Sequence, residues 1–284
     1  MDRVCVFAHY DINNIIQDYV VYYLSQLKKI CKTLIFVSDS NIDSKEIEKI
    51  SKYIDKCIIG RHEEYDFGSY KRGYQYAKEN ALLDDIEELV FVNDSCYGPL
   101  FSIENVFNKM SLLDVDFWGI NANSRGIEYC NEKLVQNNKV HVQSFFIVLK
   151  STIFKSEYFY NFINSVKKEK DKVDVVINYE LGLSHNLIKQ GFKFDVFCPL
   201  SLKVKSPHIK DNIKLIVRNQ CPFLKTSIMR LVNINDVYPM FYLFYIFLFT
   251  KYDIRLIKKD LAINKRKIPF VEIITSILRQ IIKT

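Results

Sequence analysis

Four short polar clusters in the sequence contain the residue types that bind phosphate groups and transfer protons. The clusters are His9-Tyr10-Asp11, the segment 66–72, Asn93-Asp94-Ser95 and Tyr179-Glu180. Carboxylates accept protons or bind cations, and basic side chains bind phosphate oxygens. A site for a nucleotide-diphosphate sugar needs these groups: contacts for the base, a cation for the diphosphate, and one carboxylate to accept a proton from an acceptor hydroxyl.

The cluster Asn93-Asp94-Ser95 directly follows a short apolar run, Leu89 to Val92. This composition predicts a strand that is buried on both faces. Open α/β sheets bind their ligands beyond the carboxyl ends of the strands, so the cluster is placed where a ligand site would be. Taken alone, the stretch is equally compatible with an ordinary turn in which the three side chains bond to nearby backbone.

The segment 61–73, RHEEYDFGSYKRG, leads into an expected helix that runs to residue 83. Asp66 can cap this helix, and Gly68 permits close approach of another backbone or ligand. We expect Lys71 and Arg72 in the first turn, where the helix dipole disfavours cations. A bound polyanion would explain that placement; solvent-exposed basic residues are the alternative.

Strand-like and helix-like segments alternate along the first 200 residues. We expect strands at 3–8, 33–38, 57–59, 89–92, 116–120, 141–149 and 192–198. Helices are expected at 12–30, 43–54, 104–110, 158–166 and 178–190, in addition to the one that follows segment 61–73. This alternation predicts an α/β fold with a doubly wound, mostly parallel sheet flanked by helices. The right-handed crossover rule places the ends of the first three strands at one edge. The polar segment 121–139 is expected to be a flexible loop.

The alternation ends near Pro199, where we place a domain boundary. Residues 1–200 would form the nucleotide-sugar and catalytic domain, and residues 201–284 a helical, basic C-terminal extension. Within the extension, residues 240–249 read MFYLFYIFLF, which is too short for a membrane-spanning helix of about 20 residues. This run is expected to be either a buried core helix or an interfacial helix on a membrane surface.

The charge distribution along the 284 residues bears on whether the protein binds nucleic acid or a membrane surface. The net charge is +7, and residues 251–284 hold nine basic and three acidic residues, a net of +6. A nucleic-acid binder would more often carry its basic residues across a folded face. A basic terminal segment favours contact with an anionic membrane surface, so we expect peripheral membrane contact and no nucleic-acid partner.

The cysteines and the N-terminal residues bear on the compartment. The seven cysteines are odd in number, widely spaced and without a CxxC pair, which argues against a disulfide framework or a zinc site. The first three residues lead straight into a strand-like segment instead of a long apolar signal sequence. We therefore expect a cytoplasmic protein, at the inner face of the cell membrane.

Eight motifs along residues 3–230 together resemble one family, the rhamnan synthesis F family. In chain order they are AHYD, EYDFGSYKRG, FVNDSCYGPL, DFWGI, HVQSFFIVL, NYELGLSHNLIKQGF, VKSPHIK and PFLK. That family comprises bacterial rhamnosyltransferases of cell-wall, capsule and O-antigen polysaccharide assembly. The family in turn is similar to inverting glycosyltransferases of the GT-A fold, so the resemblance implies a GT-A-like sheet in the first 200 residues.

The resemblance places Val92-Asn93-Asp94-Ser95 at the metal-binding motif of GT-A enzymes. One Asp stands here where two are usual, and a single Asp with Asn and Ser is a weak cage for Mg²⁺. Asp94 is the candidate ligand for Mg²⁺ or Mn²⁺, and metal dependence stays open.

The resemblance also implies a catalytic base. GT-A enzymes of the large inverting family carry Glu-Asp at a helix start, with the Asp as catalytic base and a glycine about three turns on. Here Tyr179-Glu180 is expected to begin the helix, and Gly191 follows eleven residues after Glu180. A helix N-terminus would stabilise the ionised Glu180. His141 and Gln143 open a strand at the same edge and are candidates for contacts to sugar or acceptor. By analogy with the lid of GT-A enzymes, Lys205 or His208 would cover the diphosphate.

The implied reaction is the transfer of L-rhamnose from dTDP-rhamnose to a lipid-linked polysaccharide acceptor, with inversion. The residues expected to bind the nucleotide sugar are His9, Tyr10, Asp11, Asp66, Gly68, Lys71, Arg72, Asn93, Asp94 and Ser95. One alternative is a transferase that uses another UDP-, GDP- or dTDP-sugar. The other is a non-catalytic module of polysaccharide assembly that has kept the fold.

Overall fold

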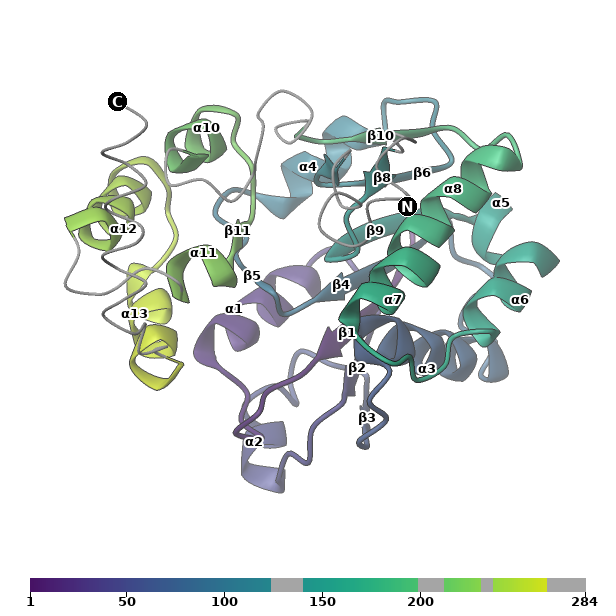
Figure 1. The fold of residues 1–284 in the computed structure, drawn as a ribbon, viewed down its shortest axis with the longest axis horizontal. Helices are drawn as coiled ribbons and strands as arrows, with labels where there is room; N and C mark the ends of the chain where they lie inside the picture. Colours follow the sequence, from purple (N-terminus) through teal and green to yellow (C-terminus); the bar gives the residue numbers. More distant parts are fainter. Residues whose placement is uncertain (124–139, 199–211, 231–236, 265–284) are drawn as a thin grey trace.

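A seven-stranded sheet forms the centre of the computed structural model, which describes residues 1–123, 140–198, 212–230 and 237–264 (Figure 1). The strand order is β10-β6-β9-β4-β1-β2-β3. The strands are β1 (Arg3–His9), β2 (Thr33–Ser38), β3 (Lys56–Ile59), β4 (Glu88–Asn93), β6 (Phe117–Gly119), β9 (Phe146–Lys150) and β10 (Phe194–Val196). Of these seven, β9 alone is antiparallel to its neighbours, β4 and β6. The predicted α/β class with a mostly parallel, helix-flanked sheet is confirmed.

The sheet separates two hydrophobic cores, because successive side chains of a strand point to opposite faces. In β1, Cys5 and Phe7 belong to one core and Val6 and Ala8 to the other. The first core also holds α1 (Asp18–Leu27) and α4 (Ile103–Met110), and the second holds α3 (Tyr65–Glu79), α5 (Ser151–Phe154), α6 (Glu157–Asn164) and α8 (Gly182–Lys189). All of β4 is buried, as its apolar composition predicts.

Several expected boundaries differ from the structure. The helix expected at 12–30 begins only at Asp18, because the Asp11 carboxylate accepts a hydrogen bond from Asn13 N (2.7 Å) and forms a turn first. The helix expected at 43–54 is short, α2 (Ser44–Glu48), and α3 ends at Glu79 instead of residue 83. The strand expected at 141–149 is two strands: β8 (His141–Val142) pairs with β7 (Ala122–Asn123), and β9 follows after a turn. Most of the loop expected at 121–139 lies outside the described residues.

The helix expected to begin at Asn178 begins six residues earlier. Asp171 caps it by accepting hydrogen bonds from Val173 N (2.7 Å) and Asp174 N (3.1 Å). The helix then continues through α7 (Lys172–Val175), a π-helical segment η2 (Val176–Leu181) and α8. Its end was predicted correctly: Gly191, with φ of +89°, follows the last turn. Glu180 therefore lies inside the helix, and the expectation that it benefits from a helix N-terminus is wrong.

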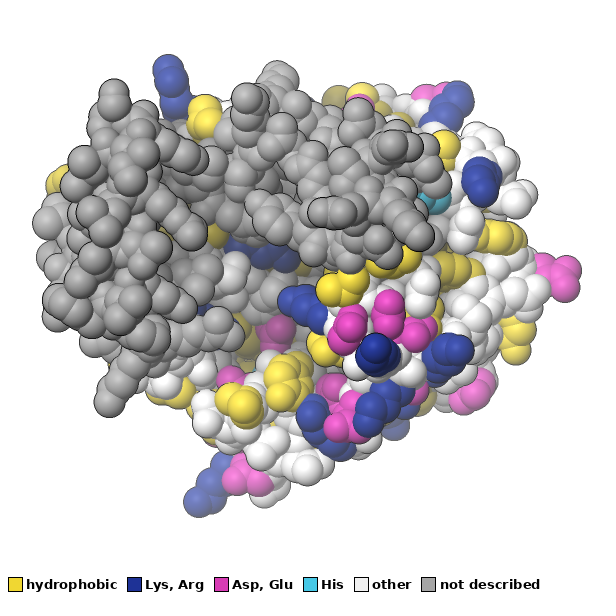
Figure 2. Space-filling view, in the orientation of Figure 1, with side chains coloured by type: hydrophobic (Ala, Val, Ile, Leu, Met, Phe, Trp, Pro, Cys, Tyr) yellow, Lys and Arg dark blue, Asp and Glu magenta, His cyan; other side chains and the backbone are white. Residues whose placement is uncertain are grey.

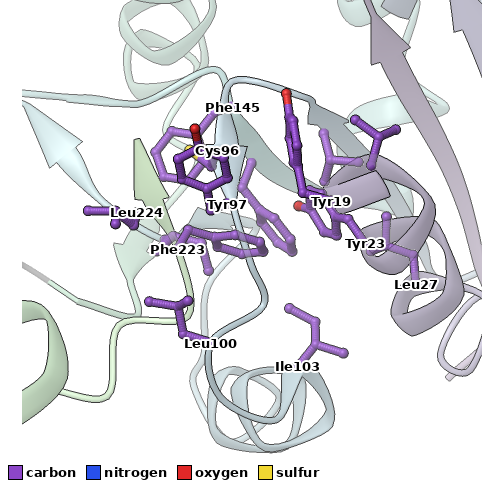
Figure 3. Close-up of a cluster of buried hydrophobic side chains, with 14 of the residues drawn as sticks. Tyr19, Tyr23, Leu27, Cys96, Tyr97, Leu100, Ile103, Phe145, Phe223 and Leu224 are labelled. Carbon is purple, nitrogen blue, oxygen red and sulfur yellow. The ribbon is translucent and has the colours of Figure 1, made fainter. Parts of the chain in front are cut away.

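Four helices among the described residues of the C-terminal region pack beside the sheet, at the left of Figure 1. They are α10 (Asn212–Arg218), α11 (Thr226–Arg230), α12 (Val237–Phe249) and α13 (Ile254–Ile263). A two-residue strand, β11 (Leu224–Lys225), pairs antiparallel with β5 (Cys96–Tyr97). Figure 3 shows Phe223 and Leu224 among Tyr97, Phe145 and Tyr23. The division at residue 200 stays a prediction; the described residues on its two sides share one core.

A buried ion pair ties the C-terminal region to the sheet. The carboxylate of Asp260, fully buried on α13, accepts hydrogen bonds from Arg230 Nη2 (2.7 Å) and Nε (3.0 Å). The phenol of Tyr97, on β5, donates to the same carboxylate. Removing one partner of such a buried pair leaves an uncompensated charge, so this triad anchors α11 and α13 next to the end of β4.

The apolar run 240–249 forms most of α12, and its described side chains divide between core and surface. Tyr242, Leu243 and Ile246 are buried, whereas the exposed large side chains are Phe244, Phe247, Leu248 and Phe249. Among the helices in the described ranges, none combines the length and the apolar character needed to cross a bilayer.

The packing of α3 on β1 can be tested at Gly73, where an added methyl group would overlap with the side chain of Val6. We expect Gly73→Ala to lower the free energy of unfolding by about 1–2 kcal/mol, because overpacking outweighs the gain in helix propensity. Gly60→Ala is the matched control, since a methyl group added at Gly60 would have no atom within 4 Å. Denaturant titration measures both; equal stabilities would contradict this packing.

Candidate functional site

The candidate site lies where β1, β2 and β4 end and where β9 begins. In the sheet register Ala8 faces Asn93, and His9 faces Ser38. Because β9 is antiparallel, its first residue, Phe146, lies beside Val92 at the same edge. In the orientation of Figure 1, Figure 2 shows basic and acidic side chains close together around the middle of the molecule. The edge predicted from the strand order therefore gathers polar residues from the ends of three strands, His9, Ser38 and Asn93, next to the start of β9.

Asp94 is held at this edge by the end of β1. Its Oδ2 accepts a hydrogen bond from Tyr10 N (2.9 Å) and lies 4.0 Å from His9 Nε2. The hydroxyl of Tyr19 donates to its backbone oxygen (2.9 Å). Burial raises the pKa of Asp94 to about 7, against the opposing effects of the Tyr10 hydrogen bond and the Arg230 charge. Because burial destabilises the ionised form of Asp94, a cation bound next to it would strongly stabilise that form.

The other residues of the first cluster have separate roles. Burial lowers the pKa of His9 to about 4, so its imidazole is neutral at neutral pH, and its Nδ1 lies 2.9 Å from Ser38 Oγ. The carboxylate of Asp11 belongs to the turn before α1. The ring of Tyr10 is about half exposed, with the guanidinium carbon of Arg61 4.9 Å from its centroid. His9 and the Tyr10 backbone thus contact Asp94, whereas the Asp11 carboxylate supports the loop.

Asn93 connects the end of β4 to the start of α3. Its Nδ2 donates to Asp66 Oδ2 (3.1 Å), and its Oδ1 accepts from Ser95 Oγ (2.6 Å) and Ser95 N (3.1 Å). Burial raises the pKa of Asp66, and the nearby charge of Glu180 raises it further. The predicted clusters at 66, 93–95 and 180 are therefore brought together.

Glu180 faces this edge from the π-helical segment η2, which packs against β8. Its Oε1 accepts a hydrogen bond from Ser144 N (3.2 Å) and lies 3.8 Å from His141 Nε2. Burial raises the pKa of Glu180, and the positive charge of Lys225 opposes that shift. Glu180 therefore lies at the predicted edge of the sheet, but in a π-helical segment instead of at a helix start. Such π segments often occur at functional sites.

Lys71 and Arg72 lie in the second turn of α3, and their expected place in the first turn is wrong because α3 begins at Tyr65. Lys71 Nζ is 3.0 Å from Glu64 Oε2, and Arg72 Nη1 is 2.7 Å from the same oxygen. Gly68 allows this arrangement, since an added methyl group there would overlap with Glu64. Both cations thus already have an acidic partner within the protein.

The remaining predicted residues are distributed as follows. His141 is buried beside Glu180, and Gln143 is partly exposed in the turn between β8 and β9, where its N–H donates to Asn121 O (3.0 Å). Lys205 and His208 lie outside the described residues.

Three residues of the site were not singled out from the sequence. Ser144 hydrogen bonds to Glu180, Arg230 lowers the pKa of Asp94, and Lys225 Nζ lies 3.1 Å from Ser95 Oγ. Lys225 ends the PFLK motif, but nothing local in that motif indicates its pairing with β5. Such long-range pairing is not readable from residue spacing.

The residues at Asp94 fit a divalent cation that arrives with a ligand. Within the described ranges, no group of three or more His, Cys, Asp or Glu side chains is placed to hold a metal ion. Mg²⁺ is commonly held by one or two carboxylates together with substrate phosphates. Asp94, partly buried and with its pKa raised to about 7, can supply one such carboxylate for Mg²⁺ or Mn²⁺.

Comparison with known proteins decides the family. The profile of the family described as rhamnan synthesis protein F matches residues 34–283. The chain belongs to this family. The virulence protein VirA of Vibrio anguillarum is 31% identical over 179 residues, which are 62% of this chain and 52% of that protein. The chain thus spans about half the length of this curated relative.

Solved structures resemble the chain only loosely. A cytidylyltransferase from Leptospira borgpetersenii serovar Hardjo-bovis is 13% identical, with a TM-score of 0.39, over 95% of this chain and 98% of that one. Core-mannan synthase A from Aspergillus fumigatus, in a Mn/GDP form, is 11% identical, with a TM-score of 0.37, over 64% and 69%. These scores are too low for either likeness to carry an argument.

The raised pKa of Glu180 has a consequence for stability. The folded protein binds this proton more tightly than the unfolded chain, so wild-type stability falls as pH rises from the unfolded pKa to the higher folded pKa. Glu180→Gln removes the ionisable group. We therefore expect the stability of the variant relative to wild type to increase across that window, in urea titrations from about pH 4 to about pH 8. A difference that stays constant with pH would mean that Glu180 ionises as it does in water.

Proposed function

We propose that this protein is an inverting glycosyltransferase with a GT-A-like catalytic region. The proposal rests on family membership together with one geometric observation, the partly buried carboxylate of Glu180 next to the polar ends of β1 and β4. Ligands of open α/β sheets bind beyond such strand ends. The proposed donor is dTDP-L-rhamnose, and the proposed acceptor is a lipid-linked glycan in cell-wall, capsule or O-antigen polysaccharide synthesis.

In the proposed reaction Glu180 is the general base. It accepts the proton of the acceptor hydroxyl while that oxygen bonds to the anomeric carbon of the donor. The bond from this carbon to the diphosphate breaks, and its electron pair leaves with the nucleoside diphosphate. A raised pKa suits this role, because a base works best when its pKa lies closer to the working pH. Ser144 N holds one carboxylate oxygen and fixes the orientation of the side chain.

The nucleotide sugar would bind along the ends of β1 and β4. Asp94 would hold a divalent cation on the diphosphate, which supplies charge neutralisation when bound. The exposed ring of Tyr10 is available for stacking. We keep His9, Asn93 and Ser95 in this donor site; the remaining proposed donor-site residues are Asp11, Asp66, Gly68, Lys71 and Arg72. His141 and Gln143 stay proposed contacts of sugar or acceptor.

Two alternatives are open to direct measurement. Another UDP-, GDP- or dTDP-sugar is compatible with the same residues, because none of the described contacts selects a base or a sugar ring. A thermal-shift panel of these donors, with and without Mg²⁺ or Mn²⁺, separates them, since a ligand that binds the native protein raises its apparent stability. Measurable donor hydrolysis would exclude the second alternative, a non-catalytic assembly module.

We also propose that α12 contacts the cytoplasmic face of the cell membrane. Its side chains Phe244, Phe247, Leu248 and Phe249 are each more than half exposed, while its other face is buried in the core. The chain from residue 251 onward carries a net charge of +6. An aromatic patch next to basic residues suits an anionic lipid surface, which would bring the enzyme to its lipid-linked acceptor.

The base assignment predicts that binding and chemistry separate in Glu180→Gln. We expect the variant to bind dTDP-rhamnose with the wild-type dissociation constant and to transfer sugar about 10²- to 10⁴-fold more slowly, because a general base is lost. Calorimetry and a transfer assay measure the two quantities. Glu157→Gln, in the first turn of α6, is the matched control and should keep full activity. Undiminished transfer by Glu180→Gln would remove the assignment.

The membrane proposal predicts that Phe244→Ser combined with Phe247→Ser weakens binding to vesicles of phosphatidylglycerol and phosphatidylcholine. Complete burial of one ring contributes about 1.5–3 kcal/mol, so partial insertion of the two rings is enough to give about a tenfold loss in co-sedimentation when both are replaced. Leu112→Ser is the control, because Leu112 is a large side chain that is 84% exposed elsewhere on the surface. Unchanged partitioning would refute the proposal, and a changed oligomeric state would assign the patch to a second copy of the chain.

A further inference from the structure

Lys225, the last residue of β11 in the C-terminal region, lies at the candidate site. Thr226 donates two hydrogen bonds to Ser95 O, from its N (2.9 Å) and its Oγ1 (3.1 Å), and Leu100 N donates to Pro222 O (2.7 Å). Phe223 and Leu224 are buried against Tyr97 and Phe145 (Figure 3). Lys225 is thereby fixed beside the Asn93-Asp94-Ser95 cluster.

The ammonium group of Lys225 contacts a hydroxyl group and an aromatic ring, and it forms no ion pair with a described residue. Its Nζ is 3.1 Å from Ser95 Oγ and 4.3 Å from the centroid of the Phe145 ring. Its charge lowers the pKa of both Asp66 and Glu180, so it lies close enough to act on both carboxylates. Within the described part of the chain, no carboxylate lies within 4.0 Å of this nitrogen.

Three other basic residues near the site differ from Lys225 in this respect. Lys71 and Arg72 both pair with Glu64, and Arg230 is held by Asp260. A partly buried ammonium is costly unless it is compensated. Ser95 Oγ and the Phe145 ring supply part of that compensation, and an anion from outside the protein would complete it.

We propose that Lys225 binds the diphosphate of the nucleotide sugar and stabilises the charge that develops on the departing β-phosphate. This inference rests on the proposed transferase function. When the bond from the anomeric carbon to the phosphate oxygen breaks, the electron pair moves to that oxygen, next to the Lys225 ammonium. The proton of the acceptor hydroxyl goes to Glu180. Lys225 therefore acts on the leaving group, and Glu180 acts on the nucleophile.

The proposal is tested with Lys225→Met and Lys225→Gln, which remove the charge, and Lys225→Arg, which keeps it. The probes are dTDP, UDP and GDP, each compared with its nucleoside monophosphate by titration calorimetry. For the diphosphate that wild type binds most tightly, we expect the neutral variants to lose roughly 10- to 100-fold in affinity, the loss of one charge-assisted hydrogen bond. The monophosphate should lose less, and Lys225→Arg should keep most of the affinity.

A second readout is the pH profile of kcat/KM. Because the Lys225 charge lowers the pKa of Glu180, the neutral variants should show the acidic limb of the profile at higher pH than wild type. A purely structural role for Lys225 would leave that limb unmoved. Lys78→Met is the control: Lys78 also lies over an aromatic ring, 3.7 Å from the Tyr160 centroid, in the last turn of α3 at the opposite edge of the sheet.

The outcomes separate this inference from the function on which it rests. If wild type binds a nucleoside diphosphate and both neutral variants bind it equally well, Lys225 is not a diphosphate ligand and the transferase proposal stands. If wild type binds none of the three diphosphates, with or without Mg²⁺ or Mn²⁺, both proposals fail. Unfolding curves recorded for every variant distinguish lost binding from lost fold.

Discussion

The reversed direction of β9 is the constraint on which the candidate site depends. A parallel strand at this position would begin at the opposite edge of the sheet, and the residues before it would lie far from the ends of β1 and β4. Because β9 is antiparallel, Asn93 N donates to Phe145 O (3.2 Å). Ser144 then lies where its O accepts from the Tyr70 hydroxyl (2.8 Å) and its N donates to Glu180. One turn thus connects α3, β4 and η2.

The second feature of the site is its excess of acid. Asp66, Asp94 and Glu180 all have a pKa raised by burial, because the charged form of each is poorly solvated. The C-terminal region opposes this with Lys225 and Arg230, which reach the site through β11 and α11. A diphosphate adds further negative charge. In the proposed complex, the Lys225 ammonium and a divalent cation at Asp94 would together offset the negative charge of the acidic residues and of the diphosphate.

Glu180 and the pair Lys71 and Arg72 show why sequence reasoning about single residues has limits. Glu180 lies at the predicted edge, but Asp171 caps the helix two turns earlier, so the argument from a helix N-terminus fails. Lys71 and Arg72 are basic residues near a helix start, and both pair with the same carboxylate, that of Glu64. Which acidic side chain pairs with a given basic residue depends on the tertiary structure, and the local sequence pattern predicts such pairs only in part.

The sequence by itself determined the class of the fold, the polar end of β4, the helix end at Gly191 and the helical run of α12. Each depends on local properties: apolar periodicity, turn chemistry or the need for a positive φ. About half of the site could also be predicted from the sequence, because His9 and Asn93 lie at predicted strand ends. Only the tertiary structure decided the direction of β9, the pairing of β11 with β5 and the place of Lys225 next to Ser95. Ser95 and Lys225 are 130 residues apart, and what joins them is the burial of Phe223 and Leu224 in a core shared with Tyr97.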